Sequence, residues 1–170
     1  MYTTSCGRNS IVLIGMPGAG KSTIGVILAK LTGLRFLDTD LDIQCQQQAT
    51  LQEIIEARGH LALRAIEEQV LLELPLERAV VSTGGSAVYS EEAMRRLRRA
   101  GPTVYLRVSL PLLEQRVAAT PDRGIASASA QSFAEVFSER TPLYEHYADH
   151  TVDADAGTAD EVAAAILALL

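Results

Sequence analysis

A short apolar run, a glycine-rich loop and an amphipathic segment follow one another near the start of the chain, and this order constrains the fold most strongly. Residues 11–14 (IVLI) are typical of a strand buried on both faces of a parallel sheet. Residues 15–22 (GMPGAGKS) have the spacing G-x-x-x-x-G-K-S, and apolar residues recur at helical spacing from Ser22 to Leu31. This order predicts an α/β fold with a mainly parallel sheet covered by helices on both faces.

The glycine-rich loop carries the groups that bind a polyphosphate. Its glycines let backbone N–H groups curl around a phosphate at the positive end of the following helix. The Lys21 ammonium can reach further phosphate oxygens, and the Ser22 hydroxyl can ligate Mg²⁺. A glycine turn with a solvated lysine is the simpler interpretation, but the strand and helix that the motif needs are both present. We expect nucleotide contacts from Gly18, Ala19, Gly20, Lys21, Ser22 and Thr23.

Strands and helices alternate along the rest of the chain. Further strands are predicted at residues 35–38, 79–82, 103–108 and 150–152. Helices are predicted within 41–74, with breaks near Thr50 and Gly59, and at 91–100, 112–119, 133–140 and 159–169. We expect the helix that begins at Phe133 to stop near Pro142. The pattern predicts about five strands in a single domain spanning residues 1–170, with a mobile polar loop at 120–132.

The composition limits the class of partner. The formal net charge of −6 argues against a broad surface for nucleic acid or anionic lipid. No apolar stretch approaches the roughly 18 to 20 residues that span a bilayer. Cys6 and Cys45 have no metal-ligand spacing, which favours a reduced, cytoplasmic protein. We therefore expect a cytoplasmic monomer that binds a small molecule, with no nucleic-acid or membrane partner.

Two carboxylates, Asp38 and Asp40, stand at the end of the second predicted strand. If the strand geometry persists, both side chains lie on one face and point into the crevice at the carboxyl ends of the strands. Phosphoryl transfer needs one carboxylate on the metal side and another to orient the attacking hydroxyl. The alternative is that either residue caps a helix beginning near Leu41.

Taken in order, the motifs of the chain resemble those of the shikimate kinase family. They are the loop 15–22, the sequence DTD at 38–40, Arg64, the sequence TGG at 83–85, Arg123 and the sequence RTPLY at 140–144. The resemblance covers residues 11–153 and implies a P-loop kinase fold with a five-stranded parallel sheet. It also implies a helical substrate-binding segment at about 41–74 and a lid at about 120–132. The implied reaction is the ATP- and Mg²⁺-dependent phosphorylation of a hydroxyl of shikimate.

The resemblance implies a role for each matching residue. The expected catalytic residues are Lys21, Asp40 and Arg123, and the expected metal contacts are Ser22 and Asp38. Arg116 is expected at the adenine, and Arg123 is expected to reach the transferring phosphate from the lid. The expected substrate contacts are Asp40, Arg64, Gly84, Gly85, Ser86 and Arg140.

The two substrate arginines are expected to hold a carboxylate by bidentate hydrogen bonds, which lysine forms less well. Glu67 lies three residues beyond Arg64 and is expected to orient it. By residue type alone, Arg64 and Arg140 fit surface charges better than binding residues. Likewise, Gly84 and Gly85 are compatible with a tight turn after a strand.

Four positions depart from the family pattern. Ser86 replaces the third glycine of a turn, His60 an acidic residue, Leu63 an aromatic residue and Gly124 a proline. Leu63 removes a flat face from the expected substrate pocket. These departures leave open a kinase of another hydroxy acid or hydroxy amino acid, similar to gluconate, homoserine or threonine. The alternative of a different class is a nucleotide-binding regulatory protein without kinase activity.

Overall fold

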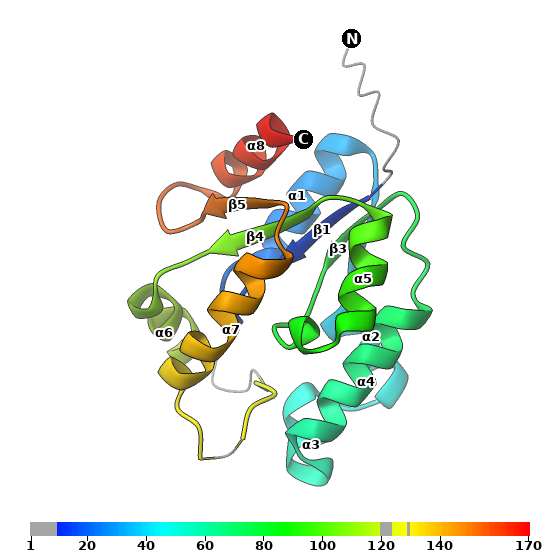
Figure 1. Cartoon of the computed structure of the whole chain (residues 1–170), viewed down its shortest axis with the longest axis vertical. Helices are drawn as coiled ribbons and strands as arrows, with labels where there is room; N and C mark the ends of the chain where they lie inside the picture. Colours follow the sequence, from blue (N-terminus) through cyan, green and yellow to red (C-terminus); the bar gives the residue numbers. More distant parts are fainter. Residues whose placement is uncertain (1–9, 120–123, 129) are drawn as a thin grey trace.

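The computed structural model describes residues 10–119, 124–128 and 130–170. Within these ranges the chain forms a parallel sheet of five strands in the order β2-β3-β1-β4-β5 (Figure 1). The strands are β1 (Ile11–Ile14), β2 (Arg35–Asp38), β3 (Ala79–Ser82), β4 (Thr103–Arg107) and β5 (His150–Asp153). All four residues of β1 are buried at the centre of the sheet, as its unbroken apolar run predicts. The predicted fold class is confirmed.

Helices cover both faces of this sheet. In Figure 1, α1 (Lys21–Thr32) and α8 (Ala159–Leu169) pack together on one face, and α5 (Glu91–Ala100) and α7 (Phe133–Tyr147) lie on the other. A short helix, α6 (Leu110–Ala118), follows β4. No helix in the described part of the chain is both long enough and apolar enough to cross a membrane.

Three helices follow β2, where the sequence predicts two or three. They are α2 (Thr39–Gln47), α3 (Leu51–Arg58) and α4 (His60–Glu73). Thr50 and Glu53 form a reciprocal capping box at the start of α3, and Gly59 separates α3 from α4. Arg96 of α5 donates hydrogen bonds to the carbonyls of Leu71 and Leu74 at the end of α4. The helical segment is thereby joined to the face of the sheet that carries α5.

The predicted end of the helix near Pro142 is wrong, because α7 continues through Pro142 to Tyr147. A proline within a helix removes a hydrogen bond and costs about 3 kcal/mol. Packing beyond the proline offsets this cost: Tyr144 is fully buried and its ring stacks on Tyr105 at 5.2 Å between centroids. The Tyr144 hydroxyl also donates to the Gly85 carbonyl at 2.6 Å. Arg140 is consequently held in the body of a helix rather than at its end.

Candidate active site

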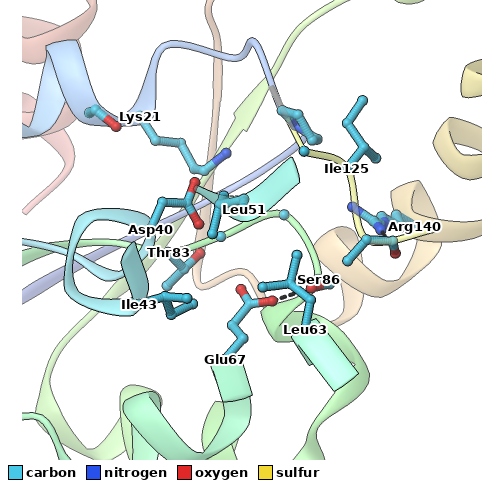
Figure 2. Close-up of a pocket in the computed structure, with 16 residues that line it drawn as sticks. Lys21, Asp40, Ile43, Leu51, Leu63, Glu67, Thr83, Ser86, Ile125 and Arg140 are labelled. Atoms are coloured by element: carbon cyan, nitrogen blue, oxygen red, sulfur yellow. Dashed lines mark hydrogen bonds between the residues drawn. The ribbon is translucent and has the colours of Figure 1, made fainter. Parts of the chain in front are cut away.

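A pocket lies at the carboxyl ends of β1, β2 and β3, between the sheet, the helices that follow β2, and α7 (Figure 2). Lys21 from α1, Asp40 from α2, Glu67 from α4 and Arg140 from α7 all contribute to it. The other lining residues are Pro17, Ser22, Ile43, Leu51, Leu63, Thr83, Gly84, Gly85, Ser86, Gly124, Ile125 and Ala126. Residues far apart in the sequence therefore meet where a parallel sheet usually binds ligands.

The glycine-rich loop places Lys21 in the lining of this pocket. Gly20 adopts a left-handed conformation with φ of +92° directly before α1, which favours glycine at that position. The buried Lys21 ammonium donates hydrogen bonds to the carbonyls of Gly15 at 2.8 Å and Met16 at 2.9 Å. The ammonium is thus held against the loop, next to the N-terminus of α1.

A second, more open groove adjoins the other side of the loop. Its lining includes the expected nucleotide residues Gly18, Ala19, Gly20, Ser22, Thr23 and Arg116. Arg116 of α6 donates a hydrogen bond to the Gly18 carbonyl at 3.1 Å. Ser22 lines both the groove and the pocket, so the two cavities meet at this residue.

The expected common face for Asp38 and Asp40 is wrong, because β2 ends at Asp38 and α2 begins at Thr39. Asp38 Oδ1 accepts hydrogen bonds from the backbone N–H groups of Asp40 at 3.1 Å and Leu41 at 3.4 Å. Asp38 is therefore the helix cap that the sequence left as an alternative. Asp40, in the first turn of α2, lines the pocket and faces Lys21 (Figure 2).

The residues expected at a metal ion are Ser22 and Asp38. The hydroxyls of Ser22 and Ser82 are 3.4 Å apart, and Ser82 is the register partner of Asp38 in the neighbouring strand. Among the described residues, no group of three His, Cys, Asp or Glu side chains could hold a metal ion. One hydroxyl with a nearby carboxylate fits Mg²⁺, which takes most of its ligands from phosphates and water in such sites.

The two expected substrate arginines converge on a single oxygen. Arg64 Nε and Nη2 donate to the Ala126 carbonyl at 3.2 and 3.1 Å, and Arg140 Nη2 donates to the same oxygen at 2.7 Å. Arg140 is only 1% exposed, which excludes the interpretation as a surface charge. Three charge-assisted donors around one oxygen form an environment that suits a carboxylate oxygen.

Glu67 lies at the base of the pocket (Figure 2). Among the described residues its hydrogen-bond partner is Ser86, whose hydroxyl donates to it, and not Arg64 as expected. Burial raises the pKa of Glu67 to about 7, and the nearby Asp40 carboxylate adds to this effect. The Ser86 hydroxyl, Arg140 and Lys21 oppose the shift. Glu67 Oε1 has no hydrogen-bond partner in the described part of the chain. The position of Glu67 three residues after Arg64 indicated a site residue, but it predicted the wrong hydrogen-bond partner.

The raised pKa of Glu67 predicts that stability depends on pH. Between about pH 4.5 and pH 7 the folded chain binds a proton at Glu67 that the unfolded chain releases, so stability from this group falls as pH rises. Across that window the loss is about 3 kcal/mol. In Glu67→Gln this dependence is expected to disappear. Thermal unfolding of both proteins over the same pH series measures it, and a constant difference between them across the window would contradict the prediction.

Gly84 separates the two carboxylates of the pocket. A Cβ atom at this position would lie 2.2 Å from Glu67 Oε1 and 2.8 Å from Asp40 Oδ1. The Gly84 N–H donates to the Thr39 hydroxyl at 2.8 Å, which ties the turn after β3 to the start of α2. Two side chains thus approach the backbone closely at this glycine. The expected acceptor contact at Gly84 stays a prediction.

The close approach predicts the effect of Gly84→Ala. The added methyl group would displace the carboxylates of Asp40 and Glu67, and a misplacement of about 1 Å at a reacting group costs about 10²-fold in rate. We expect kcat to fall by this order while the KM for nucleotide is retained, because the nucleotide groove lies on the other side of the loop. Steady-state kinetics with each substrate varied would test this, and an unchanged kcat would contradict it.

One of the expected catalytic residues, Arg123, lies outside the described residues. Part of the expected lid at 120–132 also lies outside them. The described part of that segment brings Gly124, Ile125 and Ala126 into the pocket lining. The Ala126 contact could not have been expected from sequence, because a backbone carbonyl carries no residue-type signal.

Comparison with known proteins agrees with this geometry. The family model for shikimate kinase matches residues 17–170. A shikimate kinase 2 from Yersinia enterocolitica is 35% identical over 150 residues, which cover 85% of this chain and 86% of that protein. The structure of a shikimate kinase from Acinetobacter baumannii in complex with shikimate superposes with a TM-score of 0.88 at 34% identity, covering 96% of this chain and 93% of the other.

A shikimate kinase from Aquifex aeolicus has the same fold. Its crystal structure gives a TM-score of 0.79 at 28% identity and covers 94% of each chain. The match to the family model, at residues 17–170, includes every residue that lines the pocket and the groove described above. The resemblance seen in the ordered motifs is therefore confirmed, and the chain belongs to the shikimate kinase family.

Proposed function

We propose that this protein transfers the γ-phosphoryl group of ATP to a hydroxyl of shikimate. The observation that carries this proposal is the convergence of Arg64 and Arg140 on the carbonyl of Ala126, a residue that lines the pocket together with Lys21 and Asp40. The two arginines suit the carboxylate of a small acceptor, and Asp40 suits its hydroxyl. Its carboxylate would take the position that the Ala126 carbonyl now holds.

ATP binding is assigned to the groove beside the glycine-rich loop. Backbone N–H groups at Gly18, Ala19 and Gly20 would surround the β-phosphate, with Arg116 near the adenine. Shikimate kinases in general use ATP and Mg²⁺, and here Ser22 and Asp38 would hold the ion, Asp38 through water. The bound ion would neutralise charge on the β and γ oxygens.

The transfer itself is assigned to groups in the pocket. Asp40 would orient the acceptor hydroxyl and take its proton as the oxygen bonds to the γ phosphorus. The bond from phosphorus to the β-γ bridging oxygen would break, which releases ADP. Lys21 would exchange the carbonyls of Gly15 and Met16 for phosphate oxygens, and Arg123 would add charge from the lid.

Gly84, Gly85 and Ser86 complete the proposed acceptor contacts, and residues 41–74 are proposed as the acceptor-binding part of a single domain. A Cβ atom on Gly85 would lie 2.9 Å from Arg140 Nη1, so this turn lies directly against the arginine. That the enzyme is a cytoplasmic monomer without nucleic-acid or membrane partners stays a prediction from composition.

The proposed function is tested by ADP release from the purified protein with ATP and Mg²⁺. Shikimate, quinate, gluconate, homoserine and threonine would be compared as acceptors. Turnover with shikimate alone is the expected result. Turnover with another acceptor only would replace the substrate, and binding of ATP without any turnover would favour the regulatory alternative.

A further inference from the structure

Tyr89 lies beside both of the arginines that converge on Ala126, although no sequence motif marks it. It ends a short 3₁₀ helix, η1 (Ala87–Tyr89), that follows the glycine turn after β3. The Arg64 guanidinium lies over its ring, with Cζ 3.8 Å from the ring centroid, and Arg140 Cζ lies 5.3 Å from the same centroid. Arg140 Nε also donates to the Tyr89 hydroxyl at 3.3 Å. One tyrosine thus contacts both arginines.

These contacts leave the carboxylate-binding edges of the arginines available. A guanidinium stacks through its flat face but donates hydrogen bonds from its edge. Arg64 therefore stacks on Tyr89 while its Nε and Nη2 donate to the Ala126 carbonyl. Arg140 uses Nε for the Tyr89 hydroxyl and Nη2 for the same carbonyl. Tyr89 therefore occupies Arg140 Nε but leaves the three donors that converge on the Ala126 carbonyl to an acceptor.

The hydroxyl of Tyr89 is itself fixed in direction. It donates a hydrogen bond to the Glu139 carboxylate, so its oxygen is free to accept from Arg140. The second oxygen of Glu139 accepts a hydrogen bond from Gln131 at 2.7 Å. Burial and the Glu139 hydrogen bond raise the pKa of Tyr89, which keeps the phenol protonated. The orientation of Tyr89 is thus set from α7, the helix that carries Arg140.

We infer that Tyr89 is a positioning residue that holds Arg64 and Arg140 ready to bind the carboxylate of the acceptor. An arginine side chain loses substantial rotamer freedom when it is fixed by a ligand, and prior fixation reduces this cost on binding. Tyr89 also supplies an aromatic face beside the arginines, whereas the residue before Arg64 is Leu63. This inference rests on the proposed function of the two arginines.

Tyr89→Leu and Tyr89→Phe separate the ring contact with Arg64 from the hydroxyl hydrogen bond with Arg140. Loss of the ring in Tyr89→Leu is expected to raise the KM for shikimate about 3- to 30-fold, the range for an arginine–aromatic contact. Tyr89→Phe keeps the ring and loses only the hydroxyl, so an increase of about 2- to 10-fold is expected. In both variants kcat and the KM for ATP should stay near their original values. Tyr147→Leu, which alters a tyrosine packed on His146 outside the pocket, is the matched control.

A second acceptor distinguishes positioning of the arginines from a general change in pocket shape. Methyl shikimate lacks the carboxylate charge, so Tyr89→Leu should hardly change its KM. Equal increases for the acid and the ester would overturn the inference. If Tyr89→Leu does not fold, as shown by thermal unfolding, the same comparison is made with Tyr89→Phe.

The same kinetic measurements distinguish a failure of this inference from a failure of the proposed function. A wild-type enzyme that acts on shikimate, with a raised shikimate KM in Arg140→Ala but not in either Tyr89 variant, would overturn the inference and leave the proposed function standing. A wild-type protein that does not act on shikimate would overturn both.

Discussion

Asp40→Asn is expected to lower kcat by about 10²- to 10⁴-fold, the usual contribution of a positioned proton acceptor. The amide has nearly the same shape as the carboxylate and can still accept a hydrogen bond from the acceptor hydroxyl, but it cannot take the proton. The KM values for ATP and shikimate should therefore change much less than kcat. ADP release measured at saturating concentrations of both substrates gives this result directly.

Asp42→Asn is the matched control for this prediction. Asp42 lies in the same first turn of α2 but does not line the pocket, and its raised pKa results from burial and the neighbouring Asp38. We expect its kcat to remain close to that of the original protein. If Asp40→Asn retained kcat, the proton would have to leave by another route and the role assigned to Asp40 would be wrong.

Arg140→Ala is expected to raise the KM for shikimate about 10- to 100-fold, because it removes a hydrogen bond to a charged group in a buried site. The KM for ATP should be nearly unchanged, since Arg140 lines the pocket and not the nucleotide groove. Arg140→Lys is expected to rescue little of the loss. A lysine ammonium lacks the planar fork that contacts Tyr89 and the Ala126 oxygen together.

Separate titration of each substrate in steady-state kinetics measures this split. Arg98→Ala provides the control, because Arg98 is an exposed arginine whose guanidinium pairs with the Asp149 carboxylate at 3.4 Å. Thermal unfolding would show whether Arg140→Ala remains folded at the assay temperature. Equal increases in the KM values for ATP and shikimate would contradict the assignment of Arg140 to the acceptor.

The order of secondary structure was predictable because its signals are local. The apolar run of β1, the glycines of the loop and the cap at Thr50 act within a few residues of themselves, and the structure confirms each. The loop and the order of the motifs also carried the family, which needs no knowledge of tertiary contacts. Local rules failed where packing opposes them, as at Pro142, where buried Tyr144 outweighs the cost of proline in a helix.

The candidate site could be predicted only in its residue types. As expected, Asp40 and Arg140 line the pocket and Arg64 reaches its Ala126 carbonyl. The two-residue spacing of Asp38 and Asp40 gave the wrong geometry, because the backbone changes from strand to helix between them. The partner of Glu67 was also wrong, since the sequence favours a neighbour on the same helix over Ser86, 19 residues away.

By itself, then, the sequence determined the alternation of strands and helices, the phosphate-binding loop and the family, since each is encoded by neighbouring residues. Only the tertiary structure decided which groups surround the acceptor. Tyr89 lies 51 residues from Arg140, and the Ala126 carbonyl lies 62 residues from Arg64. Contacts of this kind depend on how α4, η1 and α7 pack, and a backbone oxygen or an ordinary tyrosine leaves no pattern in the sequence from which such packing could be predicted.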